Sequence, residues 1–170
     1  MAKSNNSKSG EFTVSYISDL WSNINEQVCC ARKITRSPLP YGFIKNMSAD
    51  DVKVFLRSLQ IFILEDILRQ HREQYATITD ALYGEKSLNH KLFIKTNIPI
   101  NLIKNMTLSD KVLMLQDEIK IENLSRTASD FINKLAAPEF SITFDDFLPD
   151  EWDIERNRLY LVPLAFDYPQ

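Results

Sequence analysis

The chain has 170 residues, of which 44% are hydrophobic, 25% charged and 11% aromatic, and its formal net charge is −3. These values fit one globular domain with its own core and exclude a collagen-like, a low-complexity or a fully disordered chain. The chain has only three glycines and two cysteines. These are too few for a glycine-rich phosphate loop, a disulfide framework or a cysteine-based structural zinc site.

The first ten residues are polar and contain two lysines, which predicts a flexible tail over residues 1–10. Neither this stretch nor any later one has the apolar run of a signal peptide or the ~20 apolar residues of a membrane span. We therefore expect a soluble cytoplasmic protein in which residues 11–170 form a single helical domain.

A first helix is predicted over residues 13–34. Its apolar residues recur with the spacing of one buried helix face, from Ile17 to Ala31. The neighbouring Cys29 and Cys30 are expected to be reduced thiols on this helix. Pro38 and Pro40 restrict the residues before them to extended conformations, so we expect the helix to end ahead of them.

A second helix is predicted from Ser48 to about Asp80. Ser48 and Asp51 have the spacing of a capping box, which marks a helix start. Apolar side chains cover nearly the whole circumference of the helix over residues 59–68, as is typical of a helix packed on several sides. We therefore place this helix at the centre of the fold, with its polar end, residues 69–74, emerging into solvent.

Short helices are predicted over residues 86–106, divided by Pro99. A third long helix is predicted over residues 108–136, where Thr107 and Asp110 repeat the capping spacing found before the second helix. The apolar stripe of this helix changes phase near Glu122 and Asn123, so a bend is expected there.

The last part of the chain has a different pattern. Residues 140–144 alternate apolar and polar side chains, as a half-buried strand does, and residues 159–166 are rich in β-formers. The predicted fold is therefore mainly α: three long helices around a central apolar helix, short helices at 86–106, and a small β or irregular C-terminal segment.

Charge is unevenly distributed along the chain. By our count, residues 1–47 carry a net charge of +3, residues 48–138 are neutral, and residues 139–170 carry −6, with large aromatic side chains among the acids. Aromatic rings supply contact area and carboxylates supply steering towards a positive partner. The predicted partner-binding residues are Phe144, Asp145, Asp146, Phe147, Asp150, Glu151, Trp152 and Asp153.

The resulting hypothesis is a non-enzymatic protein-binding module that presents an acidic-aromatic surface to a basic protein partner. An immunity-protein-like inhibitor or an accessory subunit of a larger complex has this profile of small size, acidity and no catalytic motif. Two other arrangements stay open at this point. In one, the acids only solvate a loop whose rings pack on the protein's own helices. In the other, the segment docks internally on the basic N-terminal third.

The alternative function is nucleic-acid binding or processing. It would use the basic N-terminal third, or the carboxylates of Asp145, Asp146, Asp150 and Asp153 as oxygen ligands for Mg²⁺. No motif fixes the geometry of such a metal site. The sequence therefore predicts no catalytic residues, no metal and no cofactor, and it leaves the oligomeric state open.

Overall fold

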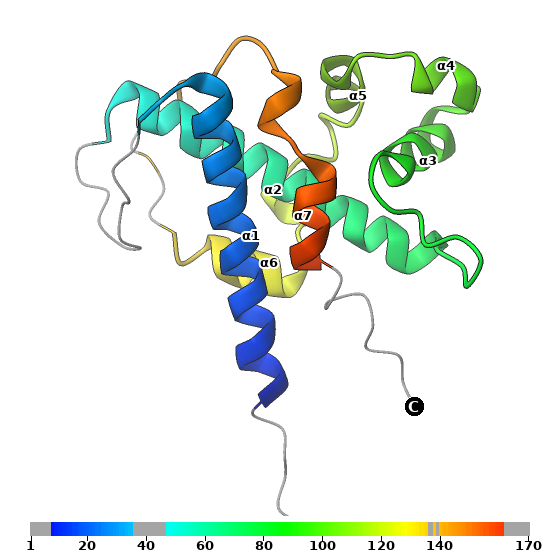
Figure 1. Ribbon diagram of the computed structural model, residues 1–170, viewed down its shortest axis with the longest axis horizontal. Coiled ribbons are helices and arrows are strands. Elements are labelled where there is room, and N and C mark those ends of the chain that lie inside the picture. The colour runs from blue at the N-terminus through cyan, green and yellow to red at the C-terminus, as the bar shows by residue number, and fades with distance from the viewer. Residues whose placement is uncertain (1–7, 36–46, 136–137, 139, 162–170) are drawn as a thin grey trace, which may run out of the picture.

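The computed structural model of the protein describes residues 8–35, 47–135, 138 and 140–161 (Figure 1). Within these ranges the chain is mainly helical and contains no β-strand, which confirms the mainly α fold predicted from the sequence. None of the helices in these ranges is both long enough and apolar enough to cross a bilayer.

The first helix, α1 (Lys8–Arg32), confirms the helix predicted over 13–34. It ends where Lys33 adopts a positive φ of 55°, while Pro38 and Pro40 lie outside the described residues. Cys29 is half-buried and Cys30 exposed, and neither is part of a disulfide. The side chains that α1 buries are at the predicted spacing: Ile17, Leu20, Trp21, Ile24 and Val28.

The central helix is α2 (Ala49–Tyr75). Its capping box is formed as predicted, since the Asp51 N–H donates to Ser48 Oγ and the Ser48 N–H donates to Asp51 Oδ2, each at 3.2 Å. The helix ends before Asp80 because Thr77 and Asp80 form a turn held by two backbone hydrogen bonds. The core side chains of α2 point in several directions: Val52, Val54, Phe55, Ile61, Phe62, Ile63, Leu64, Ile67 and Leu68.

The end of α2 differs from the prediction at His71. Residues 73 and 74 are exposed as expected, but His71 is buried and its Nε2 lies 2.8 Å from Nδ1 of His90. Burial, followed by the positive charge of Lys91, lowers the pKa of His71 to about 4. The expectation that the whole of 69–74 emerges into solvent is therefore wrong for this residue.

Two short helices follow, α3 (Glu85–Thr96) and α4 (Ile100–Lys104), and they confirm the short helices predicted over 86–106. Gly84 precedes α3 with a positive φ of 61°. This backbone conformation favours glycine, and a Cβ at this position would also displace the end of the Glu155 side chain.

The long helix predicted over 108–136 is interrupted. The chain forms α5 (Leu108–Met114), the 3₁₀ turn η1 (Ile121–Asn123) and α6 (Arg126–Ile132) instead. The predicted cap at Thr107 is present, and the phase change at residues 122–123 coincides with η1. The interruption places the Ser125 N–H and Oγ 2.7 and 2.9 Å from the carboxylate of Asp66 on α2.

The C-terminal part contains the 3₁₀ turn η2 (Pro149–Glu151) and α7 (Ile154–Leu161). Residues 140–144 form neither helix nor strand, so the irregular alternative applies to them. The β prediction for 159–166 is wrong for residues 159–161, which are helical, and its remainder lies outside the described residues. α1 packs against α2, α6, η2 and α7, whereas α3 packs against α2, α4 and α5 (Figure 1).

Candidate protein-binding site

Glu151 is the point at which the acidic C-terminal segment is attached to the helices. Its side chain has no exposed surface. The carboxylate accepts hydrogen bonds from Arg32 of α1 and, at 3.0 Å, from Nη1 of Arg57 of α2. The N–H of Leu148 adds a third bond at 3.1 Å. This carboxylate therefore joins η2 to both long helices.

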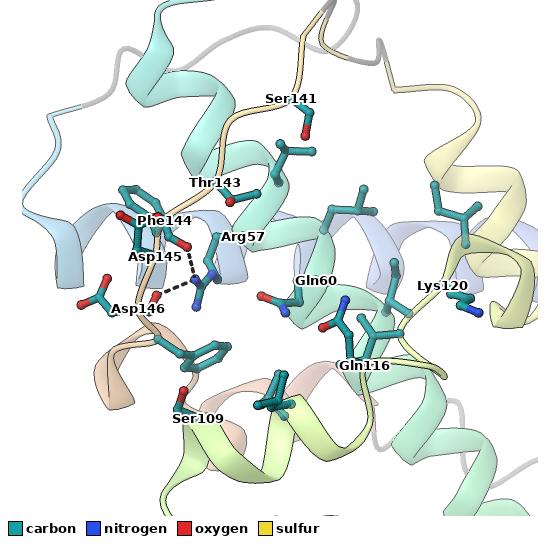
Figure 2. Close-up of a pocket in the computed structure, with 18 of the residues that line it drawn as sticks. Arg57, Gln60, Ser109, Gln116, Lys120, Ser141, Thr143, Phe144, Asp145 and Asp146 are labelled. Atoms are coloured by element: carbon teal, nitrogen blue, oxygen red, sulfur yellow. Dashed lines mark hydrogen bonds between the residues drawn. The ribbon is translucent and has the colours of Figure 1, made fainter.

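Asp146 completes the same group of charges. Arg32 Nη1 donates to Asp146 Oδ1 at 2.7 Å, and Arg57 Nη2 donates to the Asp146 carbonyl at 2.6 Å (Figure 2). The hydrogen bond from Arg32 lowers the pKa of Asp146. We call Arg32, Arg57, Asp146 and Glu151 the inner network.

Two of the aromatic side chains of this segment lie against the arginines of the inner network. The guanidinium carbon of Arg32 lies 4.0 Å from the ring centre of Phe144, and that of Arg57 lies 4.5 Å from the ring centre of Phe147. A cation over a ring face is attracted by the quadrupole of the ring. Both rings are half-buried, and they cover part of the two guanidinium groups.

Trp152 is held by a second buried polar cluster. It is 6% exposed, and its indole N–H donates to Glu65 Oε1 of α2 at 2.6 Å. Asn157 of α7 donates to the same oxygen at 2.8 Å, and its Oδ1 accepts from Asn23 and Gln27 of α1, each at 2.7 Å. Burial raises the pKa of Glu65.

The sequence did not single out Glu65 or Asn157. Glu65 lies inside the apolar run of the central helix, and a charged side chain at such a position requires buried partners. The presence of a charged residue within the apolar run was the feature of the sequence that could have identified Glu65 as part of a buried polar cluster. Its partners come from α1 and the C-terminal segment, so no local pattern could identify them.

The eight predicted partner-binding residues therefore lie in two environments. Asp146 and Glu151 are paired with arginines of the same molecule, and Trp152 is buried between the helices. For these residues the structure supports internal docking on α1 and α2. Glu151 and Trp152 are therefore not displayed to a partner, whereas the carboxylate of Asp146 is paired with Arg32 but remains 62% exposed.

The other acidic members of the set lie on the outside. Asp145, Asp150 and Asp153 are exposed, and none of them forms an ion pair within the described part of the chain. Asp153 also accepts the N–H of Arg156 at 2.9 Å, which caps the start of α7. Their negative charge is therefore available at the surface.

We call Asp145, Asp150 and Asp153 the outer acids. Two of them border a hollow of about 500 Å³ beside Trp152. Asp150 and Asp153 line it together with Glu85 and Glu155. Glu85 is paired with Lys111, and Glu155 lies 3.6 Å from Arg158. We call this feature the acidic hollow; its apolar lining consists of Leu108, Pro149, Trp152 and Ile154.

The residues named for a Mg²⁺ site do not gather into one. Asp146 is held by Arg32 and the side chain of Asp153 by the start of α7. Across residues 8–35, 47–135 and 140–161, no three histidine, cysteine, aspartate or glutamate side chains are arranged to hold a metal ion. Use of the basic N-terminal third for nucleic acid stays a prediction, and its Arg32 is engaged in the inner network.

Comparison of the chain with protein-family models, with curated proteins and with solved structures gives no match.

Proposed function

We propose that the protein is a non-enzymatic protein-binding module whose acidic hollow receives a basic segment of a protein partner. The observation that carries this proposal is the lack of counter-charge at Asp150 and Asp153. Both side chains are exposed at the rim of a concavity, and neither is ion-paired within the described residues.

The hollow combines the two kinds of contact that a basic side chain requires. Its carboxylates attract a lysine or arginine head group, and its apolar lining packs against the methylene stem of such a side chain. Trp152 lies in this lining, and its indole is fixed by Glu65. A rigid aromatic wall loses little conformational entropy on binding, which favours affinity.

The size of the site is consistent with one or two side chains of a partner. Recognition would then extend over neighbouring parts of the surface, because stable protein complexes bury about 1,200–2,000 Å² in total. An inhibitor of a basic protein and an acidic subunit of a larger complex both fit this description, and the hollow does not distinguish between them.

A binding titration with a synthetic arginine-rich peptide tests the proposal. The double variant Asp150→Asn/Asp153→Asn should weaken binding by about tenfold at low ionic strength, since each exposed ion pair contributes up to about 1 kcal/mol. The fluorescence of Trp152 reports on the hollow itself, and Trp152→Phe identifies its part of the signal relative to Trp21.

The matched control is Glu122→Gln/Asp130→Asn, which removes the same charge from exposed residues that form no ion pair within the described chain and do not line the hollow. Equal loss of binding in both double variants would show that the peptide responds only to net charge, and the proposal would then be wrong. The nucleic-acid alternative has no comparable observation in its favour and stays a prediction.

A further inference from the structure

A second concave surface lies on a different side of the C-terminal segment. It is a groove of about 620 Å³ between α2 and α5, closed at one end by residues 141–147 and at the other by residues 119–122 (Figure 2). We call it the α2–α5 groove. Its apolar lining consists of Leu56, Leu59, Ile63, Val112, Leu113, Ile119, Ile121, Phe144 and Phe147.

Part of this apolar lining is open to solvent. Leu113 is 69% exposed and Ile121 is 44% exposed, although both border the groove. Single exposed apolar residues need no explanation, but several around one concavity indicate a surface that is covered in a complex.

Two glutamines place unused hydrogen-bonding groups in the groove. Gln60 projects from α2 and Gln116 from the turn after α5, and both extend into the space between these helices (Figure 2). Neither carboxamide bonds to another residue in the described part of the chain. A carboxamide offers donors and an acceptor together, as a peptide group does, so it can pair with a bound backbone.

One wall of the groove is an irregular segment without a hydrogen-bonded neighbour. Residues 140–144 have the alternating pattern of a β-strand, and residues 140–147 make no backbone–backbone hydrogen bond within the described chain. Among the described residues, only the carbonyls of Phe144 and Asp146 are used: Arg57 donates to both, and Arg32 also donates to that of Asp146. Ser141 and Thr143 line the groove, so the segment that carries these unbonded backbone groups borders the cavity.

The charges at the two ends of the groove specify the chemistry of an occupant. Asp145 is exposed at one end, without an ion pair among the described residues. Lys120 and Glu122, which have opposite charges, both line the other end. A peptide that fills the groove is therefore attracted if it places a basic side chain at Asp145.

We propose that the α2–α5 groove binds an extended segment of a protein partner that pairs with residues 140–144 as an added strand. Apolar side chains of this segment contact α2 and α5, the carboxamides of Gln60 and Gln116 bond to its backbone, and a lysine or arginine meets Asp145. Addition of a strand to a free edge is an established mode of peptide recognition. The proposal uses a different site from the acidic hollow and does not depend on it.

Short random peptides displayed on phage and selected on the full chain supply the probe. We expect the enriched sequences to alternate apolar residues and to carry a lysine or arginine. Leu113→Gln should weaken their binding by at least about tenfold, the loss expected for an apolar side chain that is buried in the complex. Gln60→Ala and Gln116→Ala should each weaken it less.

The matched control is Leu102→Gln on α4, because Leu102 is also an exposed leucine, at 52%, and does not line the groove. Leu102→Gln should leave peptide binding unchanged, and so should Asp150→Asn/Asp153→Asn in the acidic hollow. Loss of binding in the hollow variant with no effect of Leu113→Gln would assign the peptides to the hollow and overturn the groove proposal.

Two measurements test the strand geometry itself. Hydrogen exchange should slow at the amides of residues 141–145 when the selected peptide is bound. Methylation of the peptide's backbone nitrogens should abolish binding at every second position, because alternate residues of a strand face its neighbour. Unchanged exchange at 141–145, methylation effects without this period, or a selection that enriches no groove-dependent peptide would each contradict the proposal.

Discussion

Asp150 and Glu151 are neighbours in the chain but lie in opposite environments. Glu151 has no exposed surface and bonds to two arginines, whereas Asp150 is exposed at the rim of the acidic hollow without an ion pair among the described residues. Both residues are acidic, and as neighbours they share the same surrounding sequence. The position of each carboxylate relative to Arg32 and Arg57 decides whether it stabilises the fold or remains at the surface.

The acidic residues of the C-terminal segment therefore make two different contributions, one to the stability of the fold and one to the charge of the surface. The inner network attaches the segment to α1 and α2, and the outer acids are thereby held at a fixed place on the surface. A binding surface on an irregular segment requires such attachment, because an unattached segment loses conformational entropy when it binds. Changes to the inner acids should therefore affect stability, while changes to the outer acids should affect binding.

The largest expected effect follows from Glu151→Ala. This change leaves the buried guanidinium of Arg57 without its counter-charge, and loss of one partner of a buried pair costs about 3–5 kcal/mol. Urea denaturation, followed by circular dichroism, measures the change. Asp150→Ala is the control one residue away and should change the free energy of unfolding by less than about 0.5 kcal/mol. Similar values for the two variants would remove the distinction between inner and outer acids.

A smaller effect, with a specific pH dependence, is expected for Glu65→Gln. Burial raises the pKa of Glu65 above its ordinary value of 4.5, so its stabilising contribution is complete below that pH and is lost as the pH rises through the folded value. Glutamine keeps an oxygen that accepts from Trp152 and Asn157 but does not ionise.

The stability of the Glu65→Gln variant relative to the unmodified chain should therefore increase from pH 4 to pH 8. Each unit of upward pKa shift contributes about 1.4 kcal/mol to this increase. Denaturation midpoints measured across the range test the sign. A relative stability that falls as the pH rises would show that Glu65 is stabilised in its ionised form. The positive charge of Arg72 favours that form.

The long helices were predictable because their signals are local. Ser48 and Asp51 mark the start of α2 within one turn, and the apolar residues of α1 and α2 lie at helical spacing. The break between α5 and α6 was not predictable in the same way. It involves a bond between Ser125 and Asp66, which are far apart in the sequence. Only the phase change at residues 122–123 indicated it.

The candidate site was predictable in location and not in detail. Charge and aromatic content identified residues 139–170 as unusual, and the exposed acids lie there. The orientation of each side chain depended on Arg32, Arg57 and Glu65, which reach the segment from helices that precede it by many residues. Contacts of this range leave no periodic signal in a single sequence.

The smallest effect on stability is expected for Asp150→Asn/Asp153→Asn. Both side chains are exposed, and asparagine keeps an oxygen that caps the start of α7. Removal of two charges from a segment of net charge −6 should relieve repulsion, so the free energy of unfolding should rise by no more than about 0.5 kcal/mol. This gain should disappear at about 1 M salt, where charges are screened beyond about 3 Å.

Urea denaturation at low and high salt measures this effect, with Glu122→Gln/Asp130→Asn as the control variant that removes two unpaired exposed acids elsewhere. A small, salt-sensitive gain would show that Asp150 and Asp153 have no stabilising partner within the molecule, which leaves their charge available to a basic protein. A loss of more than about 1 kcal/mol that persists at high salt would instead require a buried partner, since exposed pairs contribute less than this. The outer acids would then belong with Glu151, and the acidic hollow would lose the unpaired charge on which its proposed role depends.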